Sequence, residues 1–193
     1  EFIRADLSSQ QEIRDLARSW FHALEALVRH AAQTGASGRT PSDLPLVALS
    51  QAEIERLEGV YPRIEDVLPL SPLQEGLLFH ALYDARGPDL YTVQLELELD
   101  GALDGALLQA SVQAVVDRHA SLRAAFHHER LNRPVQAIVP RAGVPWRLHD
   151  LSGLGREEQE RKLAALRDAD RAERFDLVRP PLMRFALIRL SAE

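Results

Sequence analysis

The sequence has no cysteine, one methionine and one lysine, Lys162, in 193 residues. Without cysteine the chain forms no disulfide, has no thiolate nucleophile and binds no metal through sulfur. It also lacks a run near the roughly 20 apolar residues that a membrane-spanning helix needs, and residues 1–6 do not resemble a secretory signal. These absences favour a cytoplasmic protein that does not enter a membrane.

The charge balance argues against a nucleic acid partner. The formal net charge is -6, and acidic and basic residues are interleaved along the chain. Binding to phosphates requires clustered positive charge. The hydrophobic fraction of 46% and charged fraction of 27% are typical of a folded globular protein.

The sequence shows no self-contained active site. None of the seven histidines has a metal-binding spacing such as HExxH, and there is no GxSxG turn or glycine-rich phosphate loop after a strand. We therefore predict no metal site. The adjacent His127 and His128 are the obvious acid–base candidates, but neighbouring side chains on a strand point to opposite faces. We expect one to be packed and the other exposed, and His119 to pack beneath its helix.

Hydrophobic periodicity predicts a mixed α/β fold. The pair Ser9 and Glu12 is a capping box, and apolar residues at spacings of three and four then predict an amphipathic helix over 12–32. Strict alternation over 91–99 predicts a half-buried strand. Further helices are predicted at 51–58, 71–83, 104–119 and 156–173, and further strands at 122–128, 135–139, 146–148 and 182–190.

The composition also divides the chain. Residues 33–45 mix Gly, Ser, Thr and Pro in the manner of a linker, and Ser50 with Glu53 then repeats the capping signal. We predict a tail at 1–32, a linker with a short helix at 33–63 and a lobe at 64–193. The last apolar strand has no closing element after it, so we expect a chain cut from a longer one.

Two motifs resemble those of a known family. Residues 68–80 read LPLSPLQEGLLFH and resemble the first signature motif of condensation domains in nonribosomal peptide synthetases. Residues 118–126 read RHASLRAAF and resemble the second, RHxxLRxxF. Both occur in the family's order and separation, and the resemblance covers about 64–193. The signature positions are Ser71, Gln74, Glu75, Gly76, His119 and Phe126.

The resemblance implies a chloramphenicol acetyltransferase-like fold, of which this chain would supply only the N-terminal lobe. That lobe would be an α/β (α+β) arrangement with a mixed sheet and flanking helices. The implied reaction joins a donor peptidyl or aminoacyl thioester to an acceptor aminoacyl thioester. The implied partners are peptidyl carrier protein domains and adjacent synthetase domains. Phosphopantetheine belongs to the carriers, and no cofactor is expected to bind this chain directly.

The family's catalytic motif, HHxxxDG, is expected beyond residue 193. The resemblance therefore implies no catalytic residue in this chain and no peptide bond formation by the isolated chain. The pair His127 and His128 does not fit the motif, because Asn132 and Arg133 stand where Asp and Gly are required.

An arginine of the second motif is thought in the family to pair with the aspartate of the catalytic motif. Arg123 is the first candidate for that arginine and Arg118 the second. Both would support the active site structurally, because a guanidinium can hold a buried carboxylate through two hydrogen bonds.

The form PLSPLQEGLLFH resembles the subtype that joins a D-configured donor to an L-configured acceptor and follows an epimerization domain. Residues 1–32 resemble the C-terminal tail of an upstream epimerization or condensation-like domain, and TPSDLPL at 40–46 resembles the connector between such domains. Two alternatives stay open. One is an interaction module in which helix 12–32 docks synthetase subunits, and the other is a stand-alone acyl-CoA acyltransferase of the same fold.

Overall fold

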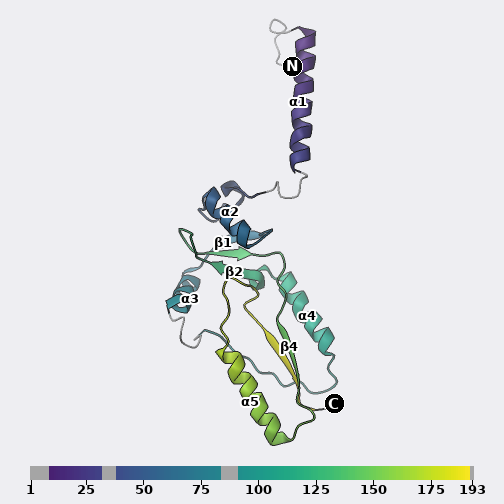
Figure 1. Cartoon of the computed structure of the whole chain (residues 1–193), viewed down its shortest axis with the longest axis vertical. Helices are drawn as coiled ribbons and strands as arrows, with labels where there is room; N and C mark the ends of the chain where they lie inside the picture. The colour runs from purple at the N-terminus through teal and green to yellow at the C-terminus, as the bar shows by residue number, and fades with distance from the viewer. Residues whose placement is uncertain (1–8, 32–37, 84–90, 192–193) are drawn as a thin grey trace. The chain divides into compact units, whose positions relative to one another are not determined.

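The computed structural model describes residues 9–31, 38–83 and 91–191 (Figure 1). The chain divides into two compact units, Glu1–Arg39 and Thr40–Glu193.

The first unit contains α1 (Gln10–Ala31), which confirms the predicted amphipathic helix. Its capping box is formed as expected: Ser9 N donates to Glu12 Oε2 at 2.6 Å, and Glu12 N donates to Ser9 Oγ at 3.3 Å. The large apolar side chains of α1 are all between 41% and 69% exposed, namely Ile13, Leu16, Trp20, Phe21, Leu24, Leu27 and Val28.

The second unit contains two sheets. One is antiparallel and places β3 (Val135–Ile138) between β1 (Asp66–Pro69) and β2 (Ala124–His127). The other is a parallel pair, β4 (Trp146–Asp150) and β5 (Phe185–Arg189). The helices of this unit are η1 (Pro41–Asp43), α2 (Gln51–Val60), α3 (Pro72–Tyr83), α4 (Gly105–Arg118), η2 (Ala120–Arg123) and α5 (Arg156–Ala172). The predicted α/β class is confirmed.

The core of the second unit is formed largely by the segment before the first strand. Leu44, Ile54 and Leu57 are at most 1% exposed and pack with side chains of β1, β2 and β3. Burial of one such side chain contributes about 1.5–3 kcal/mol. The sequence predicts a linker over 33–63, whereas residues from Thr40 onward belong to the same compact unit as 64–193.

A buried carboxylate joins α2 to the loop between β2 and β3. Glu53 accepts hydrogen bonds from Ser50 N at 2.8 Å, Ser50 Oγ at 2.7 Å and Asn132 N at 2.9 Å. The backbone N–H groups of Ser50 and then Asn132 lower the pKa of Glu53 to about 2, because they stabilise the ionised carboxylate. The ionised carboxylate of Glu53 thus holds α2 against the loop between β2 and β3.

The predicted half-buried strand at 91–99 is wrong: within the described residues the segment joins no strand ladder, and its apolar side chains are exposed. Its polar side chains hold it to α5 instead. Gln94 Nε2 donates to Arg167 O at 3.2 Å and Asp170 Oδ2 at 3.1 Å, and Arg167 Nη1 donates to Glu96 Oε2 at 3.0 Å. Alternation of apolar and polar residues indicates which side chains of an extended segment share a face. It does not indicate which strand, if any, the backbone will pair with. The apolar side chains stay exposed, namely Val93, Leu95, Leu97 and Leu99.

Two smaller expectations are also corrected. His119 is exposed, because α4 ends at Arg118 and His119 adopts an extended backbone instead of continuing the helix. The strand predicted at 182–190 forms as β5, but its positions are half-buried or exposed and none is fully buried.

The described residues contain neither a membrane-spanning helix nor a cluster of metal ligands. No helix among them is long and apolar enough to cross a membrane. Nor do their His, Asp and Glu side chains form a group of three that could hold a metal ion.

We expect Glu53→Gln to lower the free energy of unfolding by about 2 kcal/mol at pH 7, because a neutral amide accepts the backbone hydrogen bonds less strongly. The folded-state pKa of Glu53 is about 2 against an ordinary 4.5, so the unfolded state binds the proton first. The stabilisation is therefore complete above pH 4.5 and is lost as the pH falls toward 2. Urea unfolding followed by circular dichroism across this range measures it.

The matched control is Glu55→Gln on the exposed side of the same helix. Equal losses of stability for the two variants at pH 7 would contradict the role of Glu53.

Candidate functional site

The first signature motif begins as a capped helix. Ser71 N donates to Gln74 Oε1 at 2.8 Å, and Gln74 N donates to Ser71 Oγ at 3.3 Å. This is a capping box in which glutamine satisfies the free backbone N–H before α3. Pro72 occupies the first helical position, where its missing N–H costs nothing. The motif letters S-P-x-Q thus define where the helix starts.

Gln136 of β3 attaches this cap to the antiparallel sheet. Its Nε2 donates to Pro69 O and to Gln74 Oε1, both at 3.0 Å. The oxygen of Gln74 therefore accepts from its own helix cap and from a strand. Sequence reasoning missed Gln136, whose only signal is that it is the polar residue of an apolar run at Val135–Ile138.

The other signature positions differ in their surroundings. Phe126 is half-buried in β2, and its N donates to Leu177 O at 2.8 Å. Glu75 and His119 are exposed. A Cβ placed on Gly76 would meet no atom within 4 Å outside the adjacent backbone of its own helix. The structure therefore brings Ser71 and Gln74 together, but not the other four.

Arg123 is the buried cation of the second motif. Its side chain is 6% exposed. Nε donates to Val116 O at 3.2 Å, and Nη1 donates to Glu65 Oε2 at 2.6 Å and to Val139 O. One guanidinium thus joins the last turn of α4, the residue after β3 and the residue before β1. Sequence reasoning missed Glu65.

Arg118, the second candidate, has a different environment. It is the last residue of α4 and is exposed. Within the described part of the chain its side chain forms no hydrogen bond or ion pair. Of the two arginines carried over from the resemblance, only Arg123 lies against a carboxylate.

Of the adjacent histidines, His127 lies in the core and not at an open acid–base site. His127 is buried, with Nδ1 at 3.4 Å from Tyr61 Oη, and Tyr61 Oη donates to Val178 O at 3.0 Å. Burial is the main cause that lowers the pKa of His127, and burial raises the pKa of Tyr61 to about 12. His128 is half-buried, so the expectation of one packed and one exposed ring is met only for His127.

A second polar cluster, which sequence reasoning missed, lies where α5 ends. Arg184 Nε donates to Asp170 Oδ1 at 2.7 Å, Nη2 donates to Glu173 O at 2.9 Å, and the guanidinium lies 4.2 Å from the ring centre of Phe175. Burial raises the pKa of Asp170, but the hydrogen bond and charge of Arg184 outweigh it, and the net direction is downward. This cluster holds the end of α5 to the start of β5.

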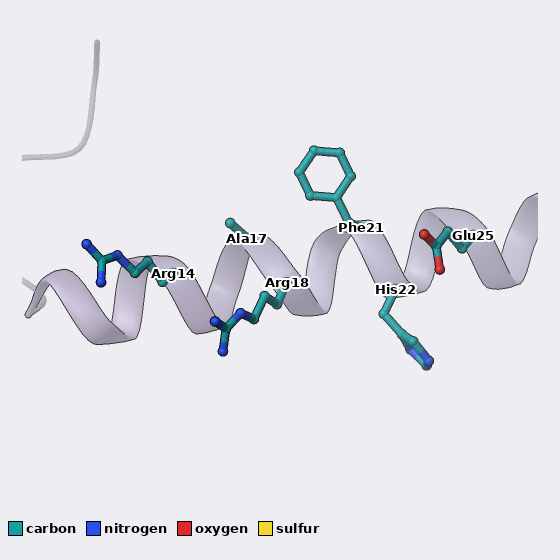
Figure 2. A pocket seen from close by; sticks show the side chains of 6 residues that line it. All are labelled: Arg14, Ala17, Arg18, Phe21, His22 and Glu25. Atoms are coloured by element: carbon teal, nitrogen blue, oxygen red, sulfur yellow. The ribbon is translucent and has the colours of Figure 1, made fainter.

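A hollow of about 430 Å³ lies along α1 (Figure 2). Figure 2 shows that Phe21 and His22 point to opposite sides of the helix. All of the lining side chains come from this one helix, namely Arg14, Ala17, Arg18, Phe21, His22 and Glu25. A single helix cannot enclose a substrate, so this hollow is an open surface groove.

Known proteins match the chain at the level of sequence. The family model described as "Condensation domain" matches residues 64–193. One of the linear gramicidin synthase subunits of Brevibacillus parabrevis is 41% identical over 187 residues, which cover 97% of this chain and 4% of that protein. Bacitracin synthase 3 of Bacillus licheniformis is 34% identical over 183 residues, which cover 94% of this chain and 3% of that protein. The chain thus spans only a few per cent of these relatives.

A solved structure matches the fold. The first condensation domain of the calcium-dependent antibiotic synthetase, in complex with substrate analogue 2a, aligns with a TM-score of 0.52 and 29% identity. The alignment covers 63% of this chain and 29% of that chain. It confirms the predicted chloramphenicol acetyltransferase-like fold over part of one such domain.

We expect Gln136→Leu to lower the free energy of unfolding by about 1–2 kcal/mol, because Pro69 O and Gln74 Oε1 each lose a donor. Amide hydrogen exchange in the first turn of α3 should accelerate with it. Gln74→Glu is the matched variant, because glutamate also completes a capping box and still accepts from Gln136. Unchanged exchange in Gln136→Leu would show that the cap is independent of the sheet.

Proposed function

Because the family model matches residues 64–193, this chain belongs to the condensation domain family, and we propose that its protein forms peptide bonds in nonribosomal peptide synthesis. In the proposed reaction the amine of an acceptor aminoacyl thioester attacks the carbonyl of a donor thioester. An amide bond forms, and the thiol of the donor carrier leaves. The family match carries this proposal, and the 41% identity to a protein of linear gramicidin synthesis supports it.

Arg123 is proposed to support the active site without carrying a proton. The N–H groups of Nε and Nη1 donate to Val116 O, Glu65 and Val139 O. The two N–H groups of Nη2 bond to no residue in the described part of the chain, so they are available to a further carboxylate. The family resemblance makes that carboxylate the aspartate of HHxxxDG, and a guanidinium would hold it in a fixed direction. Arg118 is the second candidate for this role.

The catalytic groups are proposed to come from the HHxxxDG motif, which residues 1–193 do not contain. The isolated chain is accordingly predicted to form no peptide bond. The proposed partners are donor and acceptor peptidyl carrier domains, whose phosphopantetheine arms supply the thiols, and adjacent synthetase domains in the cytoplasm.

The helix α1 is proposed to be the last helix of an upstream epimerization or condensation-like domain. Its exposed apolar side chains, including Trp20 and Leu24, suit a helix that packs against a neighbouring domain. The match to the linear gramicidin synthase of Brevibacillus parabrevis covers 97% of this chain, whereas the family model starts at residue 64. In that relative one polypeptide thus matches both the region of α1 and the condensation domain. This favours a domain tail over a docking helix. An epimerization domain there would deliver a D-configured donor.

The test is a condensation assay of the intact domain with donor and acceptor aminoacyl groups loaded on carrier protein domains. We expect dipeptidyl product by mass spectrometry, formed faster from a D-configured donor than from its L form. Arg123→Ala should lower kcat by about 100-fold, the loss that a misplacement of roughly 1 Å can cause. The isolated chain should give no product.

Two controls keep this test specific. Arg118→Ala removes the same charge from an exposed position and should keep most of the activity. Circular dichroism shows whether Arg123→Ala is folded, and Arg123→Lys replaces it if not. Equal losses at both arginines would contradict the assignment of Arg123, and an intact wild-type domain that forms no product with either donor would overturn the proposed function.

A further inference from the structure

Arg123 and Glu65 form an ion pair whose members differ in exposure. The side chain of Arg123 is 6% exposed and that of Glu65 is 49% exposed, with 2.6 Å between Nη1 and Oε2. A buried charge without partners costs several kcal/mol, so the guanidinium requires acceptors built into the fold. Glu65 is the carboxylate among them, and Val116 and Val139 contribute backbone carbonyls.

The backbone of Glu65 is held firmly. Its N–H donates to Ile138 O at 2.7 Å, and the preceding Ile64 is 5% exposed. One residue earlier, Arg63 has a φ of 63°, a left-handed conformation that non-glycine residues keep only where the surroundings impose it. The turn from α2 into β1 therefore determines where the Glu65 carboxylate lies.

Because the guanidinium is planar, fixing the positions of Nε and Nη1 also fixes the direction of Nη2. Arginine has five N–H donors in one rigid plane. Contacts at Nε and Nη1 use three of them and fix the orientation of that plane. The two donors of Nη2 are then directed as well, although they bond to none of the residues that the structure describes.

We propose that Glu65 is a positioning residue for Arg123: it holds the Nη1 edge so that Nη2 faces a second carboxylate. This inference rests on the proposed function, in which the second carboxylate belongs to the catalytic motif. Arg123 then bridges one carboxylate of this lobe and one of the catalytic loop. Because Glu65 is half-exposed, water screens its charge, and Arg123 keeps its attraction for the second partner.

The first test measures kcat and KM of the intact domain with loaded carrier proteins. Glu65→Ala should lower kcat by about 10–100-fold with KM unchanged, because Arg123 loses its orientation while the carrier surfaces are untouched. Glu65→Gln should restore most of kcat, because the amide oxygen still accepts from Nη1. Glu157→Ala removes an equal charge from the exposed side of α5 and serves as the control.

Rates are compared below the unfolding temperature of each variant, so that a loss of stability alone leaves kcat per folded molecule unchanged. If Glu65→Ala has the kcat of Glu157→Ala under these conditions, the positioning role is overturned.

The second test needs no activity. In nitrogen-15 spectra of arginine side chains, a guanidinium held at Nη1 rotates slowly and gives separate Nη signals. Glu65→Ala should speed the exchange between the Nη signals of Arg123 in the intact domain, and Glu65→Gln should leave it as slow as in the wild type. Faster exchange in Glu65→Ala together with an inactive wild-type domain would refute the proposed function but support the contact. Unchanged exchange in Glu65→Ala would refute the positioning role, whatever the activity.

Discussion

The buried guanidinium of Arg123 is the contact on which the geometry of the lobe depends. It joins Val116 at the end of α4, Val139 after β3 and Glu65 before β1, three segments that are far apart in the sequence. Arginine keeps its charge at any pH that a protein meets, so these acceptors are needed at all times. The last carbonyls of a helix carry partial negative charge, which makes the end of α4 a favourable place for a cation. The helix, the sheet and the entry to β1 are thereby held as one body.

The connector before β1 is a structural part of that body. Glu53 of α2 binds the loop after β2 through Asn132 N, and Tyr61 at the end of α2 donates to Val178 O in the segment before β5. Leu44 and Leu57 are buried in the same core. The segment that contains them therefore contacts the strands β1 to β3 and, through Tyr61, the residues before β5. Residues 40–63 therefore belong to the same compact unit as residues 64–193.

Local signals predicted local structure well. The pairs Ser9 with Glu12 and Ser50 with Glu53 each mark a helix start within a few residues, because the cap and its partner are three positions apart. Non-local pairs left no such signal. Nothing near Glu65 or Gln136 in the sequence indicates their partners 58 and 62 positions away. For the same reason the alternation at 91–99 did not indicate that Gln94 and Glu96 would bond to α5.

The two candidate arginines show why motif letters do not assign roles. Arg118 and Arg123 belong to one signature, yet only Arg123 is buried and bonded to a carboxylate. An arginine that stays protonated contributes charge and direction but transfers no proton. His127 is not placed for that task, because its ring is buried in the core with Tyr61 Oη against Nδ1. In the proposed reaction this lobe therefore supplies orientation, and the transfer of the amine proton is assigned to the histidine of the family's catalytic motif.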